Sequence, residues 1–211
     1  MSRAQSWLPW VALWLAVLGY ILPWGWHPAA SLSPGAYDLA EWTTLHPAAR
    51  SSFPPLLPSL LLRASLGVLA MLFALDVVEQ NRALLRGAAS LAALTLALSL
   101  FPPVEFFTIA RGDPNYQQQF ALGLLTLLLV VGLLGRGGRF SWTARLAMVL
   151  VLSLGGIGCS LLGAWHAVTL FHSMGVSLSV GAGSVLFAGA LGIIALVSVW
   201  GLRQDRRGLG V

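Results

Sequence analysis

Long apolar runs separated by short polar segments dominate the sequence. A helix that crosses a bilayer needs roughly 20 mostly apolar residues. Six segments meet this length and predict six transmembrane helices, at residues 7–25, 56–78, 88–107, 117–135, 146–166 and 180–201. The pattern therefore predicts an all-α, polytopic membrane bundle that forms a single domain over residues 1–211.

The composition leads to the same class. Hydrophobic residues make up 57% of the chain and charged residues only 9%, whereas soluble domains carry about 25% charged residues. A soluble chain of this size could not bury so much apolar surface, but lipid solvates it. The first apolar run ends without a small-residue cleavage site, so we interpret it as a retained span and not as a signal peptide.

Arginine positions predict the orientation. All twelve basic residues are arginine, and cytoplasmic loops are enriched in basic residues. With the N-terminus inside, the cytoplasmic set is Arg3, Arg82, Arg86, Arg136, Arg139, Arg145, Arg203, Arg206 and Arg207. Only Arg50 and Arg111 then lie outside, so we expect both chain ends in the cytoplasm and a location in the cell (cytoplasmic or inner) membrane. The basic residues lie in short loops between spans, which indicates the lipid bilayer as partner and not nucleic acid.

The first outer loop, residues 26–55, carries helix signals of its own. Ser33 is a suitable N-cap, and Pro47 ends the segment. Between them, Leu39 and Trp42 recur at helical spacing. We expect a short amphipathic helix over residues 36–46 that lies on the outer membrane surface.

Titratable side chains concentrate on the predicted outer side. All four histidines and four of the seven acids fall there. The inner side has only Asp76, Glu79 and Asp205, and each of them lies close to arginines. One interpretation is a binding site that opens outward, and the other is that solvated outer loops simply carry the polar residues. The candidate ligand-binding residues are Arg63, Glu105, Asp38, Glu41, His46, His166, His172 and Tyr116.

Arg63 is the sharpest candidate because it lies inside the second span. Its position is roughly 10 Å below the outer end of that helix. A charge at this depth is costly unless it is paired or reaches the headgroups. Glu105 is the best partner by depth, followed by Asp38 and Glu41. Pairing, contact with a ligand, and extension of the side chain to the outer headgroups remain alternatives.

Small residues recur every four positions in the last two spans. Such spacing lets helix backbones approach closely in lipid. We expect the fifth and sixth helices to pack tightly through Gly155, Gly156, Gly163, Ser184, Ala188 and Gly192. The alternative is that a partner subunit docks on this stripe.

Catalytic, metal and cofactor motifs are not found. His166 and His172 are six residues apart and would point to different faces of one helix, which does not favour haem. The chain has no zinc motif and no nucleotide-binding glycine motif, so any energy from ATP would come from a separate ATPase subunit. We therefore predict no catalytic residues, metal or cofactor. This favours a protein that is not an enzyme but leaves an enzyme or redox subunit as an open alternative.

The chain is similar in size, span number and polar outer side to the substrate-binding membrane components of energy-coupling-factor vitamin transporters. Ala12 and Ala16 fit the small-residue spacing that those proteins use against their partner. The resemblance is one of architecture. It implies binding of a small solute from the outer side.

Three functions follow from these observations. The first is a protein that binds or passes a small solute from the extracytoplasmic side, as a subunit of a transporter. The second is a structural or assembly subunit of a larger membrane complex. The third is a membrane redox or enzyme subunit that uses the outer histidines.

Overall fold

The computed structural model describes residues 3–27, 33–51, 53–77, 80 and 82–206. Glu79 and Arg207, both named above as inner charges, lie outside these ranges. The helices are α1 (Arg3–Ile21), α2 (Ala36–Thr44), α3 (Pro47–Arg50), α4 (Leu57–Asp76), α5 (Ala83–Leu98), η2 (Val104–Phe107), α6 (Pro114–Arg136), η3 (Gly137–Arg139), α7 (Trp142–Ser173) and α8 (Ala182–Arg206). Two short strands, β1 (Gly25–Trp26) and β2 (Ser179–Val180), pair antiparallel.

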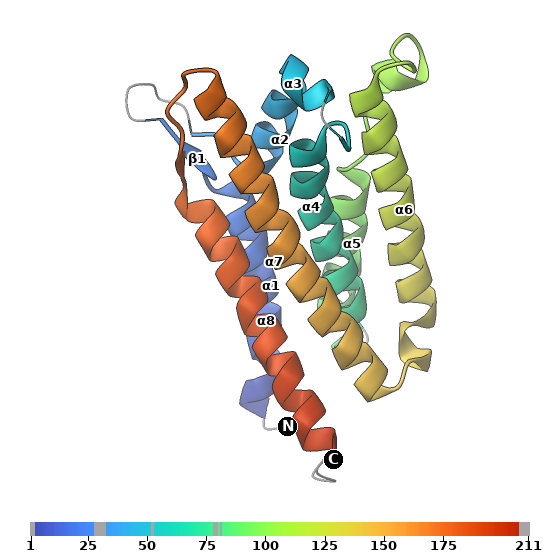
Figure 1. Cartoon of the computed structure of the whole chain (residues 1–211). Helices are drawn as coiled ribbons and strands as arrows, with labels where there is room; N and C mark the ends of the chain where they lie inside the picture. The colour runs from blue at the N-terminus through green and yellow to red at the C-terminus, as the bar shows by residue number, and fades with distance from the viewer. Residues whose placement is uncertain (1–2, 28–32, 52, 78–79, 81, 207–211) are drawn as a thin grey trace.

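The apolar helices α1, α4, α5, α6, α7 and α8 run alternately in opposite directions (Figure 1). Both termini lie at one end of the bundle, and α2 and α3 lie at the other. Among the described residues, α4, α6, α7 and α8 are long and apolar enough to cross a membrane, while α1 and α5 are shorter apolar helices. The protein is an all-helical membrane protein.

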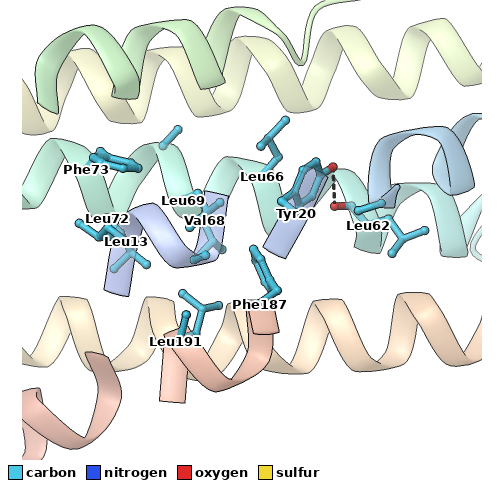
Figure 2. Packing of buried hydrophobic residues seen from close by; sticks show 14 of the residues in the cluster. Leu13, Tyr20, Leu62, Leu66, Val68, Leu69, Leu72, Phe73, Phe187 and Leu191 are labelled. Atoms are coloured by element: carbon cyan, nitrogen blue, oxygen red, sulfur yellow. Dashed lines mark hydrogen bonds between the residues drawn. The ribbon is translucent and has the colours of Figure 1, made fainter. Parts of the chain in front are cut away.

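Helix α4 occupies the centre of the bundle. Its apolar stretch is 72% buried, against 22% for α6 and 28% for α7. It packs against α7, α5, α6 and α2. Figure 2 shows Leu69 and Leu72 of α4 beside Leu13 of α1 and Leu191 of α8. The outer faces of α6 and α7 therefore remain for lipid, and α4 contacts α1, α2, α5, α6 and α7, while α8 packs against α1 and α7.

Two helices differ in extent from their predicted spans. The third span was expected at residues 88–107, but α5 ends at Leu98 because Pro102 and Pro103 cannot continue a helix. The fifth was expected to end at residue 166, but α7 continues to Ser173. Its end is closed by Gly175 at φ 78°, and Val176 N–H donates to Phe171 O at 3.0 Å. This is a Schellman cap, which glycine favours because of its positive φ.

Helix α2 begins at Ala36, the first residue of the expected segment, but it ends at Thr44 and its N-cap differs from the prediction. Gly35 is the N-cap in place of Ser33, and its N–H donates to the Asp38 carboxylate at 3.3 Å. Leu39 and Ala40 are fully buried, and α2 packs across α4. The inner face of α2 is therefore part of the protein core.

Helices α1 and α8 approach closely at the end of the bundle that carries β1. A Cβ atom on Gly19 would lie 2.6 Å from the backbone nitrogen of Phe187, so this contact requires glycine. Trp24 is fully buried there, and its indole N–H donates to Gly19 O at 2.8 Å. The short β1–β2 ladder extends the same contact beyond the helices, because Gly25 pairs with Val180.

Candidate functional site

Arg63 lies inside the protein, in the second turn of α4. Its side chain is fully buried. Nη1 donates to Asn115 Oδ1 at 2.6 Å, and Nη2 donates to Glu41 Oε1 at 2.5 Å. Since both partners come from other helices, the guanidinium joins α4 to α2 and to the start of α6. Among the three alternatives, the structure has Arg63 paired and not extended to the headgroups.

The ion-pair partner of Arg63 is not the acid that was expected first. Glu105 was expected first by depth, but it lies exposed in η2. The polypeptide leaves the helical path after Leu98, ahead of Pro102 and Pro103, and Glu105 therefore does not continue the helix face of α5. Glu41 is the ion-pair partner, and its side chain is 35% exposed, so one end of the pair reaches solvent.

A second group of hydrogen bonds surrounds this pair. Gln119 Nε2 donates to the Tyr37 hydroxyl at 2.8 Å. The Tyr37 ring lies 5.9 Å from Arg63 Cζ, within the range of a cation–π contact. The Tyr20 hydroxyl donates to Leu62 O at 3.2 Å, as the dashed line in Figure 2 shows. Polar side chains of four helices therefore meet around the first two turns of α4.

The charges of this group act on Tyr37. Burial raises the pKa of the Tyr37 phenol, the negative charge of Glu41 raises it further, and Arg63 opposes the shift. The phenol therefore keeps its proton at neutral pH and remains a hydrogen-bond donor.

Some buried polar atoms in this region have no hydrogen-bond partner among the described residues. They are Ser59 Oγ, Arg63 Nε and Gln119 Oε1. Buried polar groups are usually hydrogen-bonded to protein or to ordered water. These atoms therefore leave hydrogen-bonding capacity for water or a polar ligand at the centre of the group.

A cavity adjoins the group on the side of α1 and α5. Its volume is about 270 Å³. The walls come from α1, α2, α4 and α5, with Tyr20, Tyr37 and Asp38 as the polar contributions near its α2 side. Val17, Leu66 and other apolar side chains line the rest, so the cavity combines an apolar body with a polar rim.

The other predicted site residues are dispersed. His46 caps α3, because its Nδ1 accepts from Ala48 N–H at 3.1 Å. His172 Nε2 lies 2.9 Å from Leu178 O, which ties the end of α7 to the following loop. His166 is exposed on α7, and Tyr116 is half-buried on α6. The histidines do not gather, and the described residues contain no group of three His, Cys, Asp or Glu side chains that could hold a metal ion.

Sequence reasoning did not assign Asn115, Gln119, Tyr20 or Tyr37 to the site. A signal was present in the spacing of the polar residues. Tyr37 and Glu41, Asn115 and Gln119, and Ser59 and Arg63 are each four residues apart, so each pair lies on one helix face. Three helices with a polar pair on one face can combine these pairs in a common interior.

The predicted small-residue stripe is only partly in helix contacts. Gly156 faces Leu191 of α8 and Val68 of α4, and Gly163 faces Leu62 of α4. Gly155 and Gly192 have no neighbouring atom within 4 Å of an added Cβ, so the structure does not bring them into the packing. Ser184 is buried and Ala188 half-buried on α8.

The alanines of the energy-coupling-factor resemblance lie inside the bundle. Ala12 is 1% exposed and Ala16 is 0% exposed. A partner subunit could not reach them in this arrangement, so the expected small-residue contact with a partner does not apply to this face of α1.

No family model, no curated protein and no solved structure matches the chain.

Proposed function

We propose that this chain is a multi-pass protein of the cell membrane that binds a small solute from the extracytoplasmic side, and that it serves as a subunit of a transporter. The observation that carries this proposal is the buried Arg63–Glu41–Asn115 group beside a cavity of about 270 Å³. Arg63 joins α4 to α2 through Glu41, and both of these helices contribute walls to the cavity.

Six spans with both ends inside agree best with the arrangement of the helices. The shorter helices α1 and α5 run alongside the longer ones and reverse direction in sequence with them (Figure 1). The arginines of the short loops lie at the end that carries the termini, and basic loops favour the cytoplasm. In this orientation α2 forms part of the outer surface, and the Arg63 group and the cavity lie in the outer part of the bundle.

Accessibility labelling of single cysteines tests this topology, after Cys159 is replaced by serine. Suitable exposed positions are Phe53, Leu84, Gly112, Phe140, Ser173 and Asp205. A label that cannot cross the membrane should reach them in the order outside, inside, outside, inside, outside, inside. Two adjacent positions on the same side would contradict six spans.

A binding role accounts for features that a purely structural role leaves unexplained. Pockets for small molecules are mostly apolar, with a few placed polar groups, and run from roughly 300 to 1,000 Å³ for drug-sized ligands. The cavity beside Tyr20 is slightly smaller than this range, which favours a small solute. The unpartnered buried atoms of Ser59, Arg63 and Gln119 lie outside the cavity lining and leave hydrogen-bonding capacity for water beside it.

A substitution that fills part of the cavity tests whether the cavity binds the solute. Ser99 lines the cavity at the end of α5 and is exposed, so Ser99→Phe should occupy part of its volume without disturbing the core. Thr95→Phe, one helical turn earlier and outside the cavity lining, is the matched control. In a thermal-shift screen of small solutes, a solute that stabilises the wild type and Thr95→Phe should fail to stabilise Ser99→Phe. Equal stabilisation of all three proteins by every active solute would contradict a site in this cavity.

A role as a structural or assembly subunit is favoured by one specific observation. A Cβ atom added to Gly155 of α7 or Gly192 of α8 would have no neighbour within 4 Å in the described part of the chain, although small residues in membrane helices commonly serve helix–helix contacts. A helix of a partner subunit would find close backbone approach at these positions. Loss of a co-purifying partner in Gly155→Leu, with normal thermal stability, would favour this second function.

A further inference from the structure

The positive and negative charges near the cavity do not balance. Arg63, Glu41 and Asp38 all lie close enough to act electrostatically on Tyr20. Arg63 pairs with Glu41, and Asp38 forms no ion pair among the described residues. Asp38 lines the cavity and is exposed, and its Oδ2 accepts from Gly35 N–H at 3.3 Å. The Asp38 carboxylate is therefore hydrogen-bonded but carries a negative charge that no ion pair balances among the described residues.

The other walls suit an apolar body and a positive end group. Val17, Ile21, Leu66 and Leu96 are the apolar lining. Tyr20 and Tyr37 are intermediate in polarity between the apolar lining and Asp38, because each combines an apolar ring with a hydroxyl group. The face of such a ring attracts a cation. A carboxylate together with aromatic rings is a combination that binds ammonium groups.

An anionic ligand fits the same site poorly. The two terminal nitrogens of Arg63 already donate to Glu41 and Asn115. Arg63 is not among the residues that line the cavity. A ligand carboxylate or phosphate would therefore meet Asp38 without a free cation beside it, and like charges repel.

We propose that the cavity between α1, α2 and α5 binds an organic ammonium ion, with the protonated amine on the Asp38 carboxylate and the apolar body between Val17, Ile21 and Leu66. This inference rests on the proposed function and adds the chemical class of the solute. The amine belongs either to a free small molecule or to the headgroup of an aminophospholipid, and the shared chemistry is the protonated amine alone.

Three probes of similar shape and different charge test the inference on the full chain in detergent. They are 2-phenylethylamine, which is protonated at neutral pH, the neutral 2-phenylethanol and the anionic 3-phenylpropionate. Isothermal titration calorimetry should give the tightest binding for the amine. A charge-assisted contact makes a difference of roughly ten- to a hundredfold in the dissociation constant.

Asp38→Asn tests the residue that carries the charge. Asparagine keeps a side-chain oxygen for the Gly35 N–H and is itself a good capping residue, so the start of α2 should persist. Glu105→Gln removes the same charge from an exposed acid on η2 and is the matched control. The amine should bind Glu105→Gln as it binds the wild type, and should bind Asp38→Asn roughly ten- to a hundredfold more weakly.

The outcomes separate this inference from the proposed function. If the three probes bind equally and Ser99→Phe abolishes all of them, the cavity is a binding site but the ammonium assignment is overturned. Preferential binding of the anion overturns it as well. If no probe binds at any concentration up to 10 mM, roughly the limit of weak ligands, both the ammonium assignment and the cavity as the site are contradicted.

A competition experiment distinguishes the two sources of the amine. Short-chain phosphatidylethanolamine and phosphatidylglycerol differ in the charged headgroup. Displacement of 2-phenylethylamine by the first lipid and not by the second supports a lipid headgroup as occupant. A failure of both lipids to displace the bound probe supports a free amine.

Discussion

The two ends of α4 both carry a buried charge, but they are stabilised differently. At the end beside α2, which is the outer end in the proposed topology, Arg63 is fully buried and bonds to Glu41 and Asn115 on two other helices. At the inner end, Asp76 is 8% exposed, and it accepts a hydrogen bond at 2.8 Å from Gln80, four residues further along the chain. The cavity beside Asp76 holds only about 50 Å³, and the cavity at the outer end is about 270 Å³.

This difference indicates which end is organised for a ligand. The bonds of Arg63 to two other helices fix the positions of these helices relative to α4, whereas the hydrogen bond between Gln80 and Asp76 joins residues four positions apart in the chain. The outer end combines such long-range partners with the larger cavity. We therefore expect substitutions at the outer end to affect both stability and binding, and those at the inner end to affect stability alone and less.

The largest expected effect is that of Arg63→Leu. Removal of one member of a buried ion pair typically costs about 3–5 kcal/mol, because the remaining charge is left unpaired. The cost should lie near the lower limit of this range, since the Glu41 side chain is 35% exposed and can be hydrated. Unfolding by SDS in mixed micelles measures the free energy, and an unchanged midpoint would show that the pair is not formed.

The second largest loss of stability is expected for a substitution in the packing of α7 against α8 and the middle of α4. A Cβ atom on Gly156 would lie 2.7 Å from Leu191 Cδ1 and 3.0 Å from Val68 Cγ1, so Gly156→Leu forces these side chains to move. Overpacking of this kind costs about 1–3 kcal/mol. Gly192→Leu is the matched control, because no atom lies within 4 Å of its added Cβ. The midpoint of thermal unfolding in detergent should fall for Gly156→Leu and stay unchanged for Gly192→Leu. Equal decreases for both variants would contradict the orientation in which Gly156 of α7 faces its neighbours and Gly192 of α8 does not.

Asp76→Asn should have a smaller effect than Arg63→Leu. Asparagine keeps an oxygen that accepts the hydrogen bond from Gln80. We expect a loss of about 1 kcal/mol, typical of one altered hydrogen bond, in the same SDS titration. A loss as large as that of Arg63→Leu would remove the contrast between the two ends of the helix.

The smallest expected effect is the contribution of Tyr37 to the pH dependence of stability. The pKa of Tyr37 is raised in the folded protein, mainly by burial and by Glu41. The folded state therefore holds the phenolic proton more tightly than the unfolded state. This contribution to stability is complete below the unfolded pKa of about 10 and is lost as the pH rises above it. Tyr37→Phe should flatten the decrease in thermal stability above pH 10, and an unchanged slope would contradict a buried phenol.

Composition and hydropathy were sufficient for the helical membrane class, because the bilayer constrains the length and polarity of each span. They could not locate the end of α5, which depends on Pro102, or the partner of Arg63. The depth argument chose Glu105 because it assumed a continuous helix. Glu41 comes from a loop helix whose placement depends on tertiary packing across α4, which local patterns do not determine.

The sequence likewise predicted only some residues of the candidate site. The sequence identified Arg63 and the acids of the outer loop, since a charge in a span is unusual. It did not identify Asn115 or Gln119, because polar residues at a helix start are equally typical of turns and caps. Only their contacts with Arg63 and Tyr37 distinguish them from surface residues.

The most direct test of the account is the double-mutant cycle between Arg63→Leu and Glu41→Gln, measured by SDS-titrated unfolding with a parallel cycle between Arg63→Leu and Glu105→Gln. Residues that share a buried ion pair show coupling energies between about 0.5 and 3 kcal/mol, and residues without contact show additive effects. We predict a coupling of at least about 1 kcal/mol for Glu41 and additive effects for Glu105. Additive effects for both acids, or a coupling confined to Glu105, would contradict the arrangement of the outer end.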